Sequence, residues 1–398
     1  MEMDKPLEDI RVLSIESYGA GPWATLQLAD LGAEIIKIET PPSGDISRYV
    51  PPGAEDGDSL FYQCLNRGKK SLTLDLLAPN GMETLYRLIP TVDVLFANPK
   101  GTMPEKMGIT YDSLKQYNKR LVCCFLSGYG RVGPRKAHPG YDYLIQSLSG
   151  MAWLGGEPEG PPARCGVSVI DMATGTNAAF LMMVAIHRAR ATGVGCTVDT
   201  SLLETAISYG NYLNTWHLTT GWEPQKLAMG AHQSIVPSQM FQTSDSWLMV
   251  MAQQDKFFYA LADGLEMPEL AKDERFTSIE NRYENRDILL HLLTERFKMR
   301  STGEWIALLE GKVPVAPVNS LPQALKDPQV EALDLIIEYE HSTLGRIRQT
   351  GPPFKFSDYD PDFKPASPIG ADTEVVLQEL GNLTSDEIDE LRNSKTIQ

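Results

Sequence analysis

The sequence predicts a two-domain α/β protein whose larger domain is Rossmann-like, with a doubly wound and largely parallel sheet. From Ile10 onward, short runs that are apolar nearly throughout alternate with amphipathic helical patterns. This alternation is typical of parallel strands that helices cover on both faces. The chain has 398 residues, of which 42% are hydrophobic. It can bury a large core and exceeds the usual size of one domain.

The first half of the chain supplies these elements in order. The expected strands are IRVLSI, AEIIKI, SLTLDL, VDVLFA and RLVCCFL, and helical patterns such as PWATLQLADLG and GMETLYRLI lie between them. A long apolar helix is expected from Met172 to Ala191. The strand CTVDTSL and the helical stretch LETAISYGNYLNTWHLTTG follow it and are expected to close the larger domain.

The pattern changes after Gly230. The segment SIVPSQMFQTSDSWLMVMA predicts an antiparallel pair of strands with a turn at residues 243–246, and charged helices follow from Asp255. We expect a smaller α+β domain here. The chain ends in a predicted helix, TSDEIDELRNS, which Thr384 and Ser385 would cap.

Charge and composition limit the possible functions. The formal net charge is −16, which argues against nucleic-acid binding because phosphate contacts need a basic surface. The five cysteines show no CxxC spacing, and the six histidines form no HxH or HxxxH pair. We therefore expect reduced thiols and no metal site. No run of about eighteen apolar residues occurs, so we expect a soluble, cytoplasmic protein that does not bind membranes.

The glycine-rich segment SGYGRVGP contains a formal GxGxxG motif at Gly128, Gly130 and Gly133. A dinucleotide site would need a helix to begin there, and Pro134 with a loop follows instead. The sequence contains no GxSxG motif, so serine-hydrolase chemistry is not indicated.

Two local basic segments are NRGKKS and NPKGTMPEKMG. The second follows the strand VDVLFA directly, which would bring Asn98, Lys100 and Lys106 to the carboxyl edge of the sheet, where open α/β folds bind ligands. The alternative is a solvated cluster of lysines.

Asp171 lies between a short β-type run and the long apolar helix. Aspartate is among the best helix N-cap residues, so a purely structural role explains it. The same position favours an ionised carboxylate, which can act as a nucleophile on an activated acyl group. The local pattern leaves both roles open.

Several segments taken together resemble the class III CoA-transferase family, in which alpha-methylacyl-CoA racemase is a relative. These segments are LEDIRVLSIESYGAGPWATLQLADLGAEIIKIETPPSGDISR, NRGKKSLTLDL, NPKGTMPEKMGITYDSL, LSGYGRVGP, GYDYLIQSLSGM, VIDMATGTNAAF, AHQSIVPSQMFQT, VPVAPVNSLPQALKDPQV and GADTEVVLQELG. The resemblance covers essentially the whole chain. It implies a Rossmann-like large domain at residues 1–224, completed by 326–398, and a small α+β domain at 225–325. It also implies an interlocked homodimer.

The resemblance implies that Asp171 is the catalytic aspartate. In this family the carboxylate attacks an acyl-CoA thioester to form a mixed anhydride, and an aspartyl-CoA thioester can follow. Coenzyme A is then a substrate, carried as acyl-CoA, and no cofactor is bound permanently. Backbone N–H groups at the start of the helix could stabilise the oxyanion.

The resemblance also implies a set of residues that bind CoA. They lie in the loop after the first strand and in the segment after VDVLFA, and they are Tyr18, Gly19, Ala20, Asn98, Pro99, Lys100, Lys106 and Met107.

Tyr141 and Asp142 match a tyrosine and an acidic residue beside the catalytic aspartate, and we expect them to position the reacting groups. In the racemase branch a histidine stands where this chain has Tyr141. Racemisation needs an acid and a base of suitable pKa, and tyrosine titrates near ~10. A racemase would have to use His138 instead, so the resemblance favours transfer.

The loop GAHQS is expected to face the acceptor acid. Its Gly230, His232 and Ser234 stand where relatives cover the reaction intermediate, and the pattern AHQSIVP resembles members that handle dicarboxylates. An ordinary interdomain turn is the alternative. A non-catalytic subunit of a heteromeric transferase is a third possibility, although the chain retains Asp171.

Overall fold

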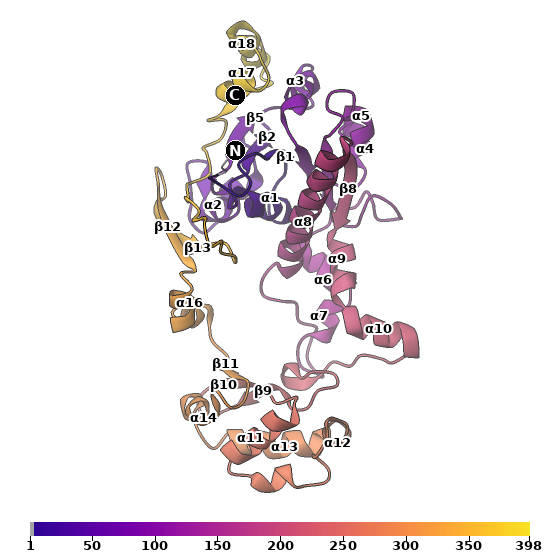
Figure 1. The fold of residues 1–398 in the computed structure, drawn as a ribbon, viewed down its shortest axis with the longest axis vertical. Coiled ribbons are helices and arrows are strands. Elements are labelled where there is room, and N and C mark those ends of the chain that lie inside the picture. Colours follow the sequence, from indigo (N-terminus) through magenta and orange to yellow (C-terminus); the bar gives the residue numbers. More distant parts are fainter. Residues whose placement is uncertain (1–3) are drawn as a thin grey trace. The chain divides into compact units, whose positions relative to one another are not determined.

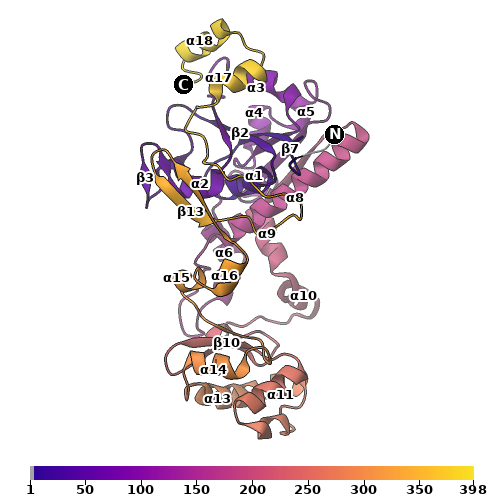
Figure 2. The same cartoon turned by 60° about the vertical axis from the view of Figure 1, so that its left-hand side comes forward.

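The computed structural model describes residues 4–398, and the chain forms two compact units (Figures 1 and 2). Unit 1 contains the chain up to Ser149 together with Gly166–Tyr209 and Glu331–Gln398. Unit 2 contains Gly150–Cys165 and Gly210–Val330. The domain limits expected from the sequence remain a prediction.

A six-stranded sheet with strand order β5-β2-β1-β6-β7-β8 forms the centre of unit 1. Every neighbouring pair is parallel, so the predicted α/β fold with a parallel central sheet is confirmed. The strands are β1 (Arg11–Ile15), β2 (Glu34–Glu39), β5 (Lys70–Thr73), β6 (Val94–Ala97), β7 (Val122–Ser127) and β8 (Cys196–Ser201).

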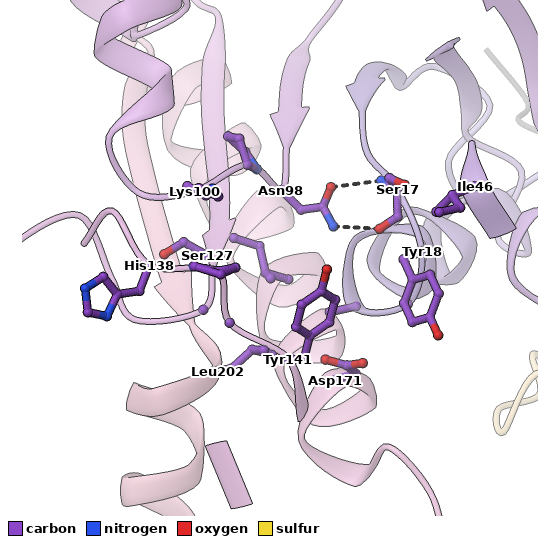
Figure 3. Close-up of a pocket in the computed structure, with 17 residues that line it drawn as sticks. Ser17, Tyr18, Ile46, Asn98, Lys100, Ser127, His138, Tyr141, Asp171 and Leu202 are labelled. Carbon is purple, nitrogen blue, oxygen red and sulfur yellow. Dashed lines mark hydrogen bonds between the residues drawn. The ribbon is translucent and has the colours of Figure 1, made fainter. Parts of the chain in front are cut away.

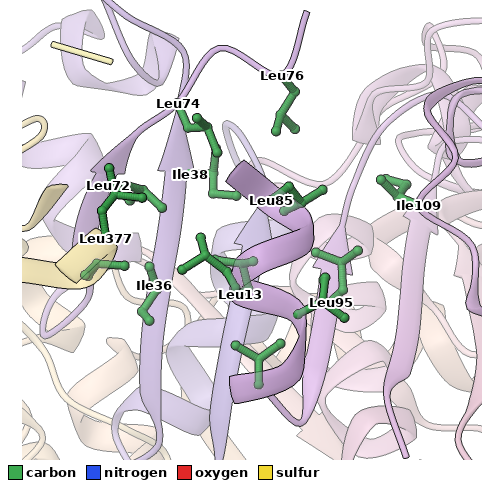
Figure 4. Close-up of a cluster of buried hydrophobic side chains, with 14 of the residues drawn as sticks. Leu13, Ile36, Ile38, Leu72, Leu74, Leu76, Leu85, Leu95, Ile109 and Leu377 are labelled. Carbon is green, nitrogen blue, oxygen red and sulfur yellow. The ribbon is translucent and has the colours of Figure 1, made fainter. Parts of the chain in front are cut away.

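Helices cover the sheet because its strands are apolar on both faces. On one face, Leu13 of β1, Ile36 of β2 and Leu95 of β6 pack into a large buried cluster (Figure 4). On the other face α1 packs against α8, which also packs on β7 and β8. The helices of unit 1 are α1 (Ala20–Ala29), α2 (Leu60–Asn66), α3 (Gly81–Leu88), α4 (Met103–Met107), α5 (Tyr111–Leu114), α6 (Asp142–Leu148), α8 (Val169–Thr192), α9 (Leu202–Tyr209), α17 (Thr373–Glu379) and α18 (Ser385–Asn393).

The C-terminal helices α17 and α18 belong to unit 1 and lie beside α3 (Figures 1 and 2). Arg87 of α3 donates a hydrogen bond of 2.8 Å to Glu387 of α18. The predicted cap at Thr384 is confirmed, because the Thr384 side chain and Glu387 form a capping box. Unit 1 also contains two short hairpins, β3 (Ala54–Glu55) with β4 (Asp58–Ser59) and β12 (Ile336–His341) with β13 (Gly345–Thr350).

The start of α8 corrects the sequence prediction. The helix was expected from Met172, after a β-type run, but it begins at Val169, and no strand precedes it directly. By length and composition α8 is long and apolar enough to cross a membrane, but half of its apolar window is buried inside the molecule. A core helix of a parallel α/β domain has this composition, because it is buried against the sheet.

Unit 2 is built around a small antiparallel sheet of order β11-β10-β9. The predicted strand pair is confirmed as β9 (Ser238–Gln242) and β10 (Trp247–Met251), and β11 (Val315–Pro317) joins β10. Phe241, Phe258, Phe297 and Trp305 form its core. Its helices are α7 (Met151–Leu154), α10 (Asn211–Thr220), α11 (Asp255–Gly264), α12 (Ile279–Glu284), α13 (Arg286–Phe297), α14 (Thr302–Leu309) and α15 (Leu321–Ala324), and α16 (Pro328–Ala332) follows across the boundary with unit 1.

Candidate active site

A cavity of about 530 Å³ opens at the carboxyl ends of the strands in unit 1 (Figure 3). The strand order reverses between β1 and β6, since the strands following β1 run to one side and those following β6 to the other. Such a reversal leaves a crevice that is the usual ligand site of open parallel sheets. The cavity is lined by Ser17, Tyr18, Gly19, Ala20, Ile46, Asn98, Pro99, Lys100, Leu126, Ser127, Gly128, His138, Pro139, Gly140, Tyr141, Asp171 and Leu202.

Most of the site residues predicted in unit 1 meet in this cavity. Tyr18, Gly19 and Ala20 contribute from the loop after β1, Asn98, Pro99 and Lys100 from the loop after β6, and Tyr141 and Asp171 complete the set. Three predicted residues do not line it. Asp142 is buried behind it, Lys106 is exposed on α4, and Met107 packs against the hydrophobic core.

Asp171 is the third residue of α8 and is buried, with 9% of its surface exposed. Its carboxylate has no hydrogen-bond partner within residues 4–398. Burial, together with the nearby Asp142 carboxylate, raises its pKa to about 7. Asp171 is therefore a carboxyl group that changes charge near neutral pH, which is typical of reactive positions.

Asp142 supplies the cap that the sequence assigned to Asp171. Its Oδ2 accepts hydrogen bonds from the backbone N–H groups of Ile170 at 2.7 Å and Asp171 at 2.9 Å, and Gln146 donates to its Oδ1 at 2.5 Å. The expectation that Asp171 caps its own helix is thus wrong. A carboxylate from α6 caps α8 and leaves the Asp171 side chain free for the cavity.

The backbone donors of α8 are also occupied, which corrects a second expectation. The N–H groups of Ile170 and Asp171 bind Asp142, and Val169 donates to Val167 at 2.8 Å. They are not available to an oxyanion at the start of this helix. The sequence could not show this, because Asp142 is 29 residues from Asp171.

The first turn of α1 offers open donors instead. Gly19 is the N-cap of α1, and a Cβ at this position would lie 2.9 Å from Oδ2 of Asp171. Backbone and carboxylate are therefore in close contact. No hydrogen-bond partner is found within the described residues for the N–H groups of Gly19, Ala20 and Gly21, as expected at a helix start that carries no side-chain cap.

Aromatic rings flank the carboxylate. Figure 3 shows Tyr141 next to Asp171 and Tyr18 on the other side of the carboxylate. The Tyr18 ring meets the Tyr141 ring edge-on at 6.4 Å and the Phe61 ring at 5.3 Å. Tyr18 has a φ of +73°, a strained conformation for a residue with a side chain. Its N–H donates to Asp45 at 3.2 Å, which holds this conformation.

Asn98 joins the two loops that form the crevice. Its Oδ1 accepts from the N–H of Ser17, and its Nδ2 donates to the carbonyl of Ser17, both at 2.9 Å (Figure 3). A Cβ at Gly21 would lie 2.7 Å from Cγ of Asn98. The amide of Asn98 is thus already used to tie the loop after β6 to the loop after β1.

Sequence reasoning missed Ser127 and Gly140 in the cavity wall, whereas Gly128 belongs to the glycine-rich bend that the sequence suggested near a site. A Cβ at Gly128 would lie 2.5 Å from Cα of Gly140, so the backbone after β7 touches the segment that leads to Tyr141. The glycines themselves were the available signal. His138 also lines the cavity, but its ring points away from Asp171 (Figure 3) and meets the edge of Tyr129 at 6.2 Å.

The predicted acid-binding loop lies in unit 2. Gly230 and His232 line a cavity of about 420 Å³ there, with Tyr212 and Met249; Ser234 lines a separate one. Nδ1 of His232 faces the N–H groups of Ser234 and Ile235, both at 3.1 Å, and must therefore be an acceptor. In neutral His232 the proton is then on Nε2, which lies 3.2 Å from the Tyr212 hydroxyl. Burial, assisted by Arg286, lowers the His232 pKa.

Comparison with known proteins adds independent information. The sequence profile described as CoA-transferase family III matches residues 7–373. The chain is 33% identical to human succinyl-CoA:glutarate CoA-transferase, covering 94% of this chain and 86% of that protein. It is 35% identical to succinate–glutarate CoA-transferase of Agrobacterium fabrum, covering 84% and 85%. A solved CAIB/BAIF family protein from Brucella suis superimposes with a TM-score of 0.80 at 32% identity, covering 95% of this chain and all of that one.

The raised pKa of Asp171 predicts that this residue makes the stability of the folded protein depend on pH. The folded pKa of about 7 exceeds the unfolded value of 3.8, so ionisation opposes folding progressively from about pH 4 and fully above pH 7. One pKa unit corresponds to about 1.4 kcal/mol. Asp171→Asn should therefore raise the free energy of unfolding by up to about 4 kcal/mol at pH 8 and by little at pH 4.

Urea denaturation at the two pH values measures this effect. The substitution Asp263→Asn, at an exposed position of α11, is the control and should change stability at neither pH. An equal gain from Asp171→Asn at pH 4 and pH 8 would show that ionisation of Asp171 is not the cause.

Proposed function

The chain belongs to CoA-transferase family III, and from this premise we propose that it transfers CoA from succinyl-CoA or a similar donor to a short dicarboxylic acid. The named relatives support this substrate class, since they include enzymes that use succinyl-CoA with glutarate, mesaconate or D-citramalate. The observation that carries the proposal is the Asp171 carboxylate, buried and without a hydrogen-bond partner in the described chain, at the wall of the strand-end cavity.

Asp171 is the proposed nucleophile. One carboxylate oxygen attacks the thioester carbonyl carbon, the C–S bond breaks, and CoA leaves as a thiolate, so that the donor acyl group and Asp171 form a mixed anhydride. The thiolate then attacks the Asp171 carbonyl carbon, which releases the donor acid and forms an aspartyl-CoA thioester. The acceptor carboxylate attacks the Asp171 carbonyl carbon of this thioester, which expels the CoA thiolate and forms a second mixed anhydride. The thiolate then attacks the acceptor acyl carbon, which forms the new acyl-CoA and restores the Asp171 carboxylate.

The environment of Asp171 suits this role. A carboxylate solvated by water is a weak nucleophile, whereas burial without hydrogen bonds leaves its lone pairs available. The pKa of about 7 means that the ionised form is well populated at neutral pH. The open N–H groups at the start of α1 support the tetrahedral oxyanion, in place of the occupied donors of α8.

The CoA substrate would lie along the loops after β1 and β6. Tyr18, Gly19 and Ala20 together with Asn98 and Pro99 line the wall for the pantetheine chain. Lys100 and Lys106 are exposed cations at this end of the sheet and would bind the phosphates as point charges. We expect no permanently bound cofactor.

The assembly is proposed to be an interlocked homodimer in the cytoplasm, although pairing with a related chain would also supply a second subunit. Apolar side chains on the surface of α8 support a subunit contact, since Phe180 is 67% exposed and Val184 is 48% exposed. Apolar groups exposed next to each other on one helix commonly mark an interface.

Isotope exchange tests the reaction. The purified protein is incubated with succinyl-CoA and a panel of dicarboxylates in deuterated water, and the thioesters are analysed by mass spectrometry. New acyl-CoA without deuterium at the α-carbon is expected, and Asp171→Asn should abolish it. Deuterium uptake without new thioesters would instead show a racemase. No reaction of the pure homomer, restored by adding a related chain, would show a non-catalytic subunit.

The contact between Gly19 and Asp171 predicts a second effect. In Gly19→Ala the new methyl group displaces the Asp171 carboxylate, because only 2.9 Å separates it from Oδ2. Displacement by about 1 Å can reduce a rate by about 10²-fold, so the turnover number should fall by this order while the fold persists. Gly166→Ala, which adds a methyl group in open space, should keep normal turnover; equal losses in both variants would contradict this explanation.

The loop in unit 2 is proposed to bind the acceptor acid. With His232 donating from Nε2, the Tyr212 hydroxyl proton is left to donate into the cavity of about 420 Å³. Tyr212→Phe should raise the KM for the acid by about 10-fold, as expected for one lost hydrogen bond to a charged group, and leave the KM for acyl-CoA unchanged. Tyr259→Phe, at an exposed position of α11, is the control. An unchanged KM for every acid would exclude this role.

A further inference from the structure

The basic segment NRGKKS has no part in the proposed CoA contacts, and the structure shows why. Arg67 pairs with Asp30 and Lys70 pairs with Glu34, whereas the Lys69 side chain is only 1% exposed. Lys69 lies beneath the loop after β1, next to a second buried cation, Lys37 of β2. Two buried lysines under one loop need a physical explanation, because each loses its hydration.

Lys37 holds the start of this loop through Asp45. Its Nζ lies 2.5 Å from Oδ2 of Asp45, and neither side chain is exposed. Oδ1 of Asp45 accepts from the Ser17 hydroxyl at 2.9 Å and from the Tyr18 N–H at 3.2 Å. The ion pair thus fixes the two residues that come before Gly19.

Lys69 clamps both ends of the same loop. Its Nζ donates to Oε1 of Glu16 and to the carbonyl of Pro22, both at 2.8 Å. It also donates to Oδ1 of Asn66 at 3.1 Å, and this oxygen accepts from Lys37 at 3.0 Å. Residues 16–22 are therefore held at their first residue, at their middle and in the first turn of α1.

We propose that Lys69 is a positioning residue of CoA transfer, whose ammonium group clamps residues 16–22 so that the Gly19 backbone stays against Asp171. The inference rests on the proposed function. Buried ion pairs contribute little net stability compared with apolar residues of the same volume, so the imposed geometry is their main effect here. Loss of the Lys69 charge removes the attraction to Glu16 and loosens the clamp.

The titration of Lys69 makes the clamp accessible to experiment. Burial lowers the Lys69 pKa, Glu16 and Asp45 oppose this effect, and the Lys37 charge adds to it, so that the resulting pKa is about 8. Asp30, which is paired with Arg67, also interacts with Lys69. Because the folded pKa lies below the value of 10.5 for a free lysine, the unfolded state binds more protons between pH 8 and 10. Deprotonation of Lys69 therefore stabilises the folded state. A loss of activity between pH 8 and 10 would then not be caused by unfolding that follows the titration of Lys69.

The experiment measures CoA exchange between pH 6 and 10 for the wild type, Lys69→Met, Glu16→Gln and Lys70→Met. The wild-type rate should decline above about pH 8. Lys69→Met should lower the turnover number by about 10²-fold at pH 7 and lack the alkaline decline. Glu16→Gln keeps hydrogen-bonding groups but removes the charge that raises the Lys69 pKa, so its decline should begin at lower pH. Lys70→Met should match the wild type.

Hydrogen exchange of a peptide covering residues 16–22, followed by mass spectrometry at pH 7 without substrate, reports on the clamp directly. Faster exchange is expected in Lys69→Met but not in Lys70→Met. The inference is overturned if Glu16→Gln retains the wild-type pH profile, or if Lys69→Met retains both wild-type turnover and wild-type exchange. If Lys69→Met does not fold, the pH profile of Glu16→Gln alone tests the inference. Absence of transfer by the wild type at every pH would overturn the proposed function. Hydrogen exchange of the peptide covering residues 16–22 would still test whether Lys69 clamps this loop.

Discussion

The close contact between α1 and α8 is the constraint on which the candidate site depends. A Cβ at Gly175 would lie 2.6 Å from the carbonyl oxygen of Ala20, so this glycine lets the two helices approach. Asp171 lies one helical turn before Gly175 and therefore on the same face of α8. The close approach of α1 and α8 that brings Gly175 into contact with Ala20 also brings Asp171 into contact with Gly19. A larger residue at either contact would separate the carboxylate from the open donors of α1.

Burial alone does not distinguish Asp171, because several carboxylates of unit 1 are buried. Burial alone would raise the pKa of Asp45, yet Lys37 and the hydrogen bond from the Ser47 N–H lower it to about 2. Burial would also raise the pKa of Glu39, but Arg48 lowers it below its usual value. Asp171 has no such partner and has Asp142 nearby, so its pKa rises. The protein neutralises its structural carboxylates and leaves this one uncompensated, which fits a reagent better than a structural element.

The sequence predicted the parallel sheet because its strands, such as residues 94–97 and 122–127, are buried on both faces and read as uninterrupted apolar runs. It also placed Asp171 and the two strand-end loops in one site. It did not predict that Asp142 caps α8, because a cap from another helix leaves no local signal at Val169. It read NRGKKS only as a basic segment, because burial of a lysine depends on partners such as Glu16 that are distant in the sequence.

The positive charges near the cavity are of two kinds, buried lysines that are paired and lysines that are exposed. The chain carries a net charge of −16, so an acyl-CoA, itself an anion, meets unfavourable long-range electrostatics. Lys37 and Lys69 do not reverse this, because buried carboxylates already neutralise them. We propose that their effect is geometric and acts through the backbone of residues 16–22, which they hold. In the proposed function, local attraction comes from Lys100 and Lys106, which are exposed, and from the start of α1, whose partial positive charge is directed at the cavity. Binding is thus proposed for the exposed lysines that follow β6, and positioning for the buried lysines in β2 and directly before β5.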